Sequence, residues 1–274
     1  MKKTLAFLLA AILVLFSFAA CASSNEAPAA DEAPAADDTP ASDLATIQAN
    51  GKLVVGITDY EPMDYKDENG NWTGFDAEFA QLFAEELGIE CEFFVIADWG
   101  KKFVELETKN IDCVWNGMTI TEEATSNASV SNPYVINAQV VVMKADKISS
   151  VQSAADLADL AVAVENGSAG ETAATDAGVK NIISKQDQAG ALLEVKSGTA
   201  DACVIDITMA NAMTGEGSDY ADLAAGISLT SEEYGVAFRK DSDLTAKFNA
   251  FMEKLIADGT LQALADKYQL TLVK

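Results

Sequence analysis

The sequence contains no histidine and only one arginine, Arg239, in 274 residues. Without histidine, the chain lacks the commonest general base, every Ser-His or Cys-His nucleophile, and the usual protein ligand of zinc and iron. Basic residues are scarce as a whole, since 18 lysine and arginine side chains stand against 43 acidic ones, for a formal net charge of −25. Because nucleic acids and anionic lipid surfaces are recognised through basic patches, this charge argues against both as partners.

Cysteine is also sparse, and its spacing argues against a metal centre. The four cysteines are Cys21, Cys91, Cys113 and Cys203, and no two of them form a Cys-x-x-Cys pair. We therefore expect no metal site. No cofactor is expected either. The last three lie in apolar runs and are interpreted as buried free thiols, with a Cys91–Cys113 disulfide as the alternative.

The first 21 residues have the features of an export signal. Two lysines precede an apolar segment at 5–16, which is too short for a membrane-spanning helix. The segment ends in Phe-Ala-Ala-Cys, which resembles a bacterial lipobox and makes Cys21 the candidate lipidated N-terminus. The alternative is plain secretion with cleavage near Ala20.

Residues 22–43 are predicted to form a disordered acidic tether. They contain Glu-Ala-Pro-Ala-Ala-Asp twice in tandem, three of the five prolines, and no large apolar side chain. Because this segment has little to bury, nothing offsets the entropy lost on ordering it. Fully extended, it reaches at most roughly 70 Å.

From residue 44 onward, short apolar runs alternate with helical patterns. We predict helices over 76–87, 99–109, 189–195, 244–256 and 260–268, the first with Asp76 as its N-cap. The predicted strands cover 53–57, 91–96, 111–115, 160–164, 182–183 and 202–205. This alternation is typical of an α/β fold with mostly parallel sheets, and the segment is long enough for two lobes. Because ligands bind at the carboxyl ends of such strands, Asn116 and Asp206 are candidates for a cleft.

Several motifs, in order along the chain, resemble the polar amino-acid family of extracellular solute-binding proteins, which feed ABC importers. They are Gly51-Lys-Leu-Val-Val-Gly-Ile-Thr-Asp59, Gly74-Phe-Asp76, Asn116-Gly-Met-Thr-Ile-Thr121, Ser131-Asn-Pro-Tyr134, Glu233-Tyr-Gly-Val236 and Ala257-Asp-Gly-Thr260. The resemblance implies a type II periplasmic-binding-protein-like α/β fold, in which two lobes joined by two hinge strands close on a ligand. Lobe 1 would comprise 44–139 with 236–274 returning to it, and lobe 2 would comprise 140–235.

The same resemblance implies a role and a location. We expect a lipid-anchored binding protein facing outside the cell, monomeric, without enzymatic activity, and partnered by ABC permease subunits and a small ligand. A sensory lipoprotein is the alternative. The fold also hosts dehydratases, for which Glu165 or Glu123 would be the candidate proton donor.

Site residues follow from the resemblance position by position. Tyr60 and Trp99 match aromatic side chains that sandwich the ligand, a role suited to aliphatic or cationic groups, although both could instead be core residues. Head-group contacts are implied for Asn116, Gly117, Thr119 and Ser168, the last of them at a helix N-terminus. Asp206 matches the carboxylate that pairs with the α-ammonium, its alternative role being a helix N-cap. Asp59 either joins it or is a plain turn residue.

One departure bears on the ligand. The family carries Thr-x-Glu-Arg where this chain has Thr121-Glu-Glu-Ala124, so the arginine that grips the α-carboxylate is missing. Arg239 resembles an outer strand end and is a poor substitute, while Glu165 stands at a position that can be basic in relatives. Two ligands remain open: a polar or cationic amino acid whose carboxylate is held by hydroxyls, N–H groups and a lysine such as Lys101, or a cationic amine lacking a carboxylate.

Overall fold

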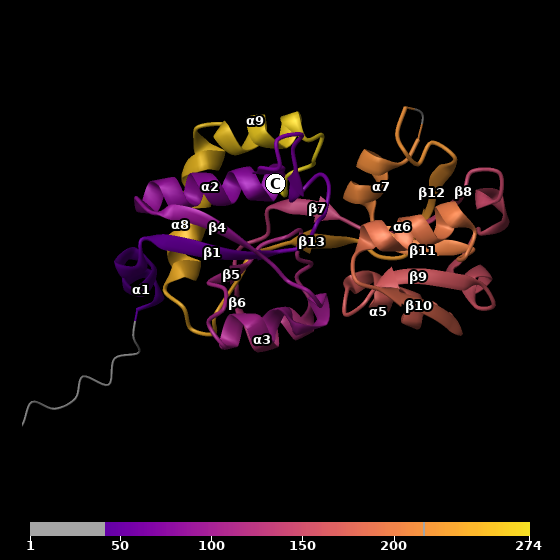
Figure 1. Ribbon diagram of the computed structural model, residues 1–274, viewed down its shortest axis with the longest axis horizontal. Coiled ribbons are helices and arrows are strands. Elements are labelled where there is room, and N and C mark those ends of the chain that lie inside the picture. Colours follow the sequence, from indigo (N-terminus) through magenta and orange to yellow (C-terminus); the bar gives the residue numbers. More distant parts are fainter. Residues whose placement is uncertain (1–41, 216) are drawn as a thin grey trace, which may run out of the picture. The chain divides into compact units, whose positions relative to one another are not determined.

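The computed structural model describes residues 42–215 and 217–274, in which two five-stranded sheets form the framework (Figure 1). The predicted signal peptide, the lipidation site Cys21 and nearly all of the tether lie outside the described residues. The first sheet has the order β4-β1-β5-β14-β6. Its strands are β1 (Lys52–Ile57), β4 (Glu90–Val95), β5 (Cys113–Val114), β6 (Ser129–Val130) and β14 (Ala237–Phe238).

The second sheet has the order β10-β9-β11-β8-β12. Its strands are β8 (Gln139–Lys144), β9 (Ala161–Glu165), β10 (Asn181–Lys185), β11 (Ala202–Asp206) and β12 (Leu223–Ser228). Both sheets are mixed, whereas the sequence pattern predicted mostly parallel ones. The difference arises because β14 and β8 run antiparallel to β5 and β11, respectively.

Two further strands connect the sheets. β7 (Val135–Asn137) leads from the first sheet to the second, β13 (Glu232–Tyr234) leads back, and the two pair antiparallel. A short hairpin, β2 (Tyr65–Lys66) with β3 (Trp72–Thr73), precedes the first long helix. The protein therefore has the predicted two-lobed α/β fold, and we call the first and second sheets with their helices lobe 1 and lobe 2.

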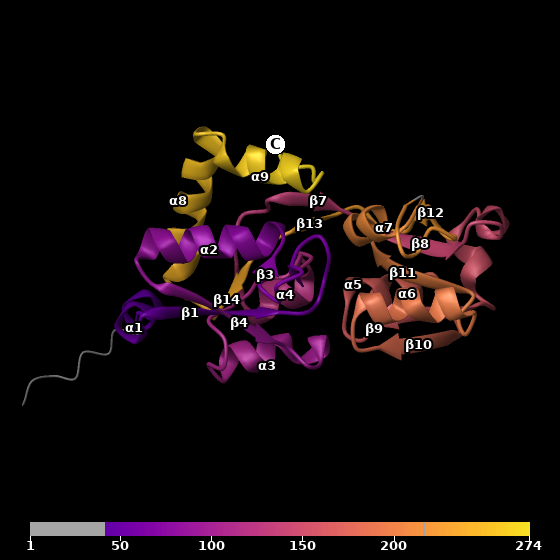
Figure 2. The ribbon, with the colours of Figure 1, turned by 45° about the horizontal axis from the view of Figure 1, so that its top comes forward.

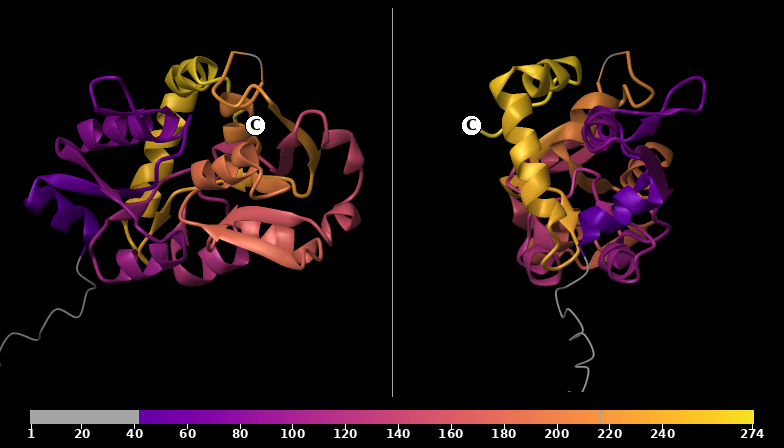
Figure 3. Two further views of the ribbon diagram at one scale, coloured as in Figure 1. Left: turned by 45° about the vertical axis from the view of Figure 1, so that its right-hand side comes forward. Right: turned by 90° about the vertical axis from the view of Figure 1, so that its left-hand side faces the viewer.

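Helices cover the sheets of both lobes. Lobe 1 carries α1 (Asp43–Asn50), α2 (Phe75–Leu87), α3 (Lys102–Glu107), α4 (Glu122–Asn127), α8 (Leu244–Ala257) and α9 (Thr260–Lys267). Lobe 2 carries α5 (Ala169–Asp176), α6 (Gln188–Ser197) and α7 (Ile207–Met213), and short 3₁₀ turns occupy Trp99–Lys101, Ile148–Ser150 and Ala154–Leu157. The C-terminal helices return to lobe 1, where α9 contacts α2 and α8 contacts β14 (Figures 2 and 3). No helix among the described residues is both long and apolar enough to cross a membrane.

The core of lobe 1 is rich in aromatic side chains from α2 and α8. The ring centroids of Phe79 and Phe248 lie 5.4 Å apart, and both rings pack edge-on against Trp115, which is fully buried. Asp76 is not the predicted N-cap, because the helix begins at Phe75 after Gly74 and the Asp76 carboxylate points into the core. Cys91, Cys113 and Cys203 are free thiols, so the alternative Cys91–Cys113 disulfide is absent.

Candidate functional site

A cavity of about 350 Å³ is lined by residues of both lobes and of the connecting strands. Seven of the nine side chains expected from the sequence lie on its wall: Trp99, Asn116, Gly117, Thr119, Glu165, Ser168 and Asp206. Asn116 follows β5, and Asp206 ends β11, so the cavity lies at the carboxyl ends of these two strands. Parallel α/β sheets present their ligand sites at this edge.

The other two expected residues are not on the cavity wall. Tyr60 is buried, and its hydroxyl lies 2.5 Å from both Thr208 Oγ1 and the Tyr234 hydroxyl. Its ring packs behind Gly117, where an added Cβ would come within 2.6 Å of it. Asp59 is exposed and does not line the cavity. The structure therefore makes Tyr60 a support for the cavity floor.

Gly117 has a conformation that few other residues adopt. Its φ is +55°, and its N–H donates to Asp76 Oδ2 at 2.6 Å. The same carboxylate oxygen accepts from the Tyr134 hydroxyl at 2.8 Å. Burial raises the pKa of Asp76 to about 7, with Gly117 and Tyr134 opposing the shift. The buried carboxylate thus fixes the backbone of the cavity floor.

Asp206 belongs to a network of carboxylates and amides. It precedes α7, but its side chain makes no cap hydrogen bond and accepts instead from the amides of Asn137, Gln139 and Gln188. Asn137 and Gln139 also donate to Glu232 Oε1, at 2.7 Å and 2.6 Å. Burial, and then the charge of Glu232, raises the pKa of Asp206 to about 6. The amides orient two acids of like charge toward one cavity.

Glu165 adds a third buried carboxylate to the cavity. It is the last residue of β9, and its side chain is 3% exposed. Its Oε1 has no hydrogen-bond partner. Burial raises the pKa of Glu165 well above its ordinary value, and the charges of Asp206 and Asp187 act in the same direction. A buried carboxylate oxygen without a donor is energetically costly, so this atom favours a ligand that supplies one.

The hydroxyls expected to bind a head group are engaged within the protein. Ser168 caps α5, its Oγ accepting from Glu171 N at 3.1 Å, while Gly167 N donates to Glu171 Oε2 at 2.7 Å. Thr119 Oγ1 donates to Glu232 Oε1 at 2.9 Å. The Thr119 hydroxyl therefore already uses its only donor, whereas the Ser168 hydroxyl acts only as an acceptor and keeps its O–H donor for a ligand.

A lysine missed by sequence reasoning lines the cavity. Lys102 is 5% exposed, and its Nζ donates to the carbonyl oxygens of Trp99 at 3.3 Å and Gly167 at 3.1 Å. Burial lowers its pKa. Lys101, which was suggested from the sequence, instead has an exposed side chain and pairs with Asp98 at 3.3 Å. Residues three apart on a helix share a face, so the position of Lys102 three residues after Trp99 was the feature of the sequence that could have identified it.

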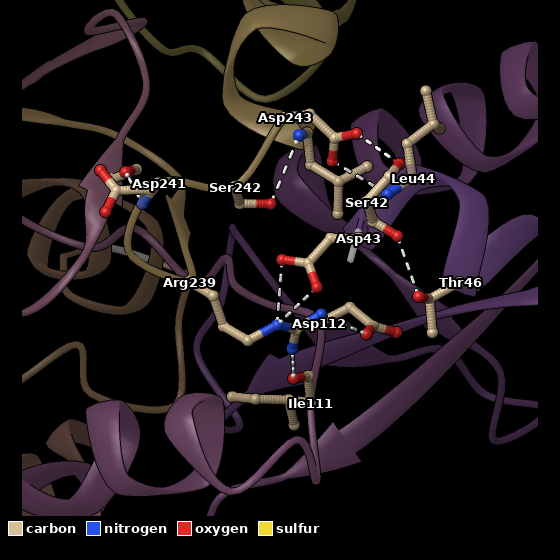
Figure 4. Close-up of polar contacts among 12 residues, drawn as sticks. Ser42, Asp43, Leu44, Thr46, Ile111, Asp112, Arg239, Asp241, Ser242 and Asp243 are labelled. Atoms are coloured by element: carbon tan, nitrogen blue, oxygen red, sulfur yellow. Dashed lines mark hydrogen bonds and ion pairs between the residues drawn. The ribbon is translucent and has the colours of Figure 1, made fainter. Parts of the chain in front are cut away.

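Arg239 lies outside the cavity, as expected for an outer strand end. Its Nε donates to both carboxylate oxygens of Asp43 at 3.0 and 3.1 Å, and its Nη2 donates to Asp112 at 3.0 Å (Figure 4). Its Nη1 donates to the carbonyl of Ile111 at 2.7 Å. The side chain is 11% exposed, so the only arginine of the sequence is committed to holding α1 against lobe 1.

Relatives among proteins of known function are amino-acid-binding proteins. The chain is 31% identical over 274 residues to the arginine-binding extracellular protein ArtP of Bacillus subtilis. This match covers 98% of each of the two chains. It is 30% identical over 229 residues to the L-cystine-binding protein TcyJ of Escherichia coli, covering 82% of this chain and 85% of that protein.

Solved structures agree with these relatives. Holo ArgBP from T. maritima, a protein also solved as an arginine-bound mutant, is 35% identical, with a TM-score of 0.71, and the match covers 77% of this chain and 93% of that one. An ancestral amino-acid-binding protein described as a precursor of cyclohexadienyl dehydratase is 34% identical, with a TM-score of 0.76 and coverage of 83% and 99%. The model of the bacterial extracellular solute-binding proteins, family 3, matches residues 53–271. The chain therefore belongs to family 3 of the bacterial extracellular solute-binding proteins.

Proposed function

We propose that this protein is the substrate-binding lipoprotein of an ABC importer and that it captures a cationic amino acid or amine in the inter-lobe cavity. The observation that carries the proposal is the charge of the cavity wall. Six acidic side chains line it, namely Glu122, Glu123, Glu165, Asp176, Asp206 and Glu232, against the single lysine Lys102. Of these, Glu165 and Asp206 are buried, and because like charges in a poorly solvated space destabilise one another, a ligand cation relieves the repulsion between them.

Three groups have complementary roles in holding such a ligand. Asp206, oriented by its amide partners, accepts from the ligand ammonium. Trp99 presents an aromatic surface to the aliphatic or cationic part. Glu165 offers the oxygen that has no donor in the protein. The arginine named for ArtP and for ArgBP supports a cationic ligand for this chain as well.

Binding from both sides couples the ligand to the arrangement of the lobes. Asn116 and Trp99 belong to lobe 1, whereas Glu165 and Asp206 belong to lobe 2. A ligand that contacts both walls favours the arrangement in which the walls face each other, and a permease can distinguish that arrangement. Lipidation at Cys21 and the acidic tether would keep the protein beside that permease. A sensory role would use the same binding step.

A thermal-shift panel tests the ligand class. We expect arginine, lysine, ornithine and small polyamines to raise the melting temperature, and glutamate and aspartate to leave it unchanged. Asp206→Asn and Glu165→Gln should suppress the cation shifts, while Asp159→Asn, which removes an exposed acid that does not line the cavity, should not. Shifts with acidic amino acids and none with cations would contradict the proposal. Ligand recovered unchanged after long incubation would support binding without turnover.

The anchor is tested separately. Cells expressing the full chain with Cys21→Ala should release the protein into the medium or periplasm and lose labelling by a fatty-acid analogue. Unchanged membrane retention in that variant would rule out lipidation at Cys21. Uptake of the identified ligand, lost on deletion of the adjacent permease genes, separates import from sensing.

A further inference from the structure

Of the described residues that line the cavity, Lys102 alone is basic. We propose that Lys102 recognises a carboxylate of the ligand, so that the preferred ligand is a cationic α-amino acid with a free carboxylate and not the corresponding decarboxylated amine. This inference rests on the proposed function and specifies the ligand class that the same cavity selects.

Within the described chain the ammonium of Lys102 forms no direct ion pair, although the charges of Glu123, Glu165 and Asp98 act on it and oppose the lowering of its pKa by burial. Both of its hydrogen-bond acceptors, on Trp99 and Gly167, are neutral carbonyls. No carboxylate of the described residues lies within 4.0 Å of Lys102 Nζ, the distance limit for an ion pair, although acids line the cavity. A lysine ammonium has three N–H donors, so one remains after the two carbonyl contacts. A ligand carboxylate supplies both the acceptor and the opposite charge.

The side chains around Lys102 hold its ammonium group in place. Its Nζ lies 5.0 Å from the ring centroids of Trp99 and Phe103, so two aromatic rings flank it and limit its movement. Trp99 and Ala124 belong to one buried apolar cluster, against which Phe103 packs. Since Ala124 contributes no charge, Lys102 is the available cation on this wall.

The cavity therefore has two poles that match a zwitterion. Asp206 and Glu232 provide the acidic pole from lobe 2 and the connecting strands, and Lys102 provides the basic pole from lobe 1, where the charges of Glu123 and Glu165 also act on it. An α-amino acid places its ammonium and carboxylate on one carbon and can address both poles at once. A diamine meets the acidic pole but has no carboxylate for Lys102, so that only a cation could lie beside it, which is unfavourable at short range.

Matched ligand pairs test the inference by isothermal titration calorimetry. Arginine is compared with agmatine and lysine with cadaverine, on wild type, Lys102→Met, Lys102→Arg and Lys101→Met. For wild type we expect each amino acid to bind about 10- to 100-fold more tightly than its amine, because one charge-assisted hydrogen bond contributes a factor of about this size to affinity. Lys102→Met should weaken amino-acid binding by about that factor and modestly strengthen amine binding, because a repulsive charge is gone.

The controls separate recognition from scaffolding. Lys102→Arg keeps the charge and should retain the preference, and Lys101→Met changes an exposed lysine outside the cavity and should match wild type. Lys102→Gln, checked for folding by circular dichroism, serves as the second neutral variant. Equal weakening of amino acid and amine in both neutral variants would overturn the inference, because it would mean that Lys102 only bridges to Gly167. Equal binding of both ligands by wild type overturns it too, with the proposed function intact, whereas binding of neither overturns both.

Discussion

Replacing Asp206 with asparagine should stabilise the ligand-free protein while abolishing capture of a cation. Asp206 is 5% exposed and shares the amides of Asn137 and Gln139 with Glu232. Asparagine keeps the size and one acceptor oxygen but removes the charge. The substitution therefore isolates the energetic cost of holding an ionised acid in this site.

The pKa of Asp206 sets the magnitude. Burial and Glu232 raise it from 3.8 to about 6, so above that pH the ionised carboxylate destabilises the folded state relative to the unfolded one. A difference of roughly two pH units corresponds to about 3 kcal/mol at neutral pH. The new amide N–H₂ faces the donor of Gln188, and the lost hydrogen bond costs about 1 kcal/mol. The net gain is about 1–2 kcal/mol, or roughly 3–6 °C in melting temperature for a fold of this size.

The sign of the pH dependence provides the sharper assay. Because the folded-state pKa is raised, the Asp206 contribution favours the folded protein below about pH 4 and is lost as pH rises toward 6. Urea unfolding should therefore show Asp206→Asn as the more stable protein at pH 7.5, and the order should reverse near pH 4, where the lost hydrogen bond of about 1 kcal/mol outweighs the remaining cost of ionisation. Asp76, with its pKa of about 7, is common to both proteins and cancels in this difference.

Two results would refute the reasoning. A variant less stable than wild type at pH 7.5 would mean that the amide network stabilises the charged acid by more than its burial costs. An undiminished thermal shift with arginine would mean that Asp206 does not hold the ligand cation. Asp159→Asn is the control, since it removes an exposed acid paired with Lys180 and should change stability by no more than about 1 kcal/mol.

Two further substitutions probe the support of the site. Arg239→Met should lower the free energy of unfolding in urea by about 3 kcal/mol, because it leaves two largely buried aspartates without their cation. The ligand affinity measured by calorimetry should not change. A variant as stable as wild type would contradict a stabilising role for Arg239. Gly117→Ala should weaken ligand binding, because its φ of +55° disfavours alanine and the new Cβ comes within 2.6 Å of the Tyr60 ring. Gly198→Ala is the control: its φ is +83° and no atom lies near the new Cβ, so it should cost only backbone strain and leave the ligand affinity unchanged. An equal loss of affinity in both alanine variants would show that contact with the Tyr60 ring is not the cause.

Much of the fold and part of the candidate site could be predicted because they depend on local patterns. The alternation of apolar runs with helical spacing indicated the two-lobed α/β fold, and polar residues directly after strands identified Asn116 and Asp206 as neighbours of one cavity. Helix α1 was not predicted, because its start is fixed by Ser42 and by contacts with Asp243 about 200 residues away in the chain.

Side-chain partners were beyond the reach of the sequence. It determined that charge is strongly negative and that arginine is scarce, which already made a cationic ligand plausible. Only the tertiary structure decided that Lys102 and not Lys101 faces the cavity, that Tyr60 supports the floor from behind Gly117, and that Arg239 is committed to α1. The physical reason is that periodicity records which face of an element is buried, whereas charge pairing and burial of a single side chain depend on segments brought together only by folding.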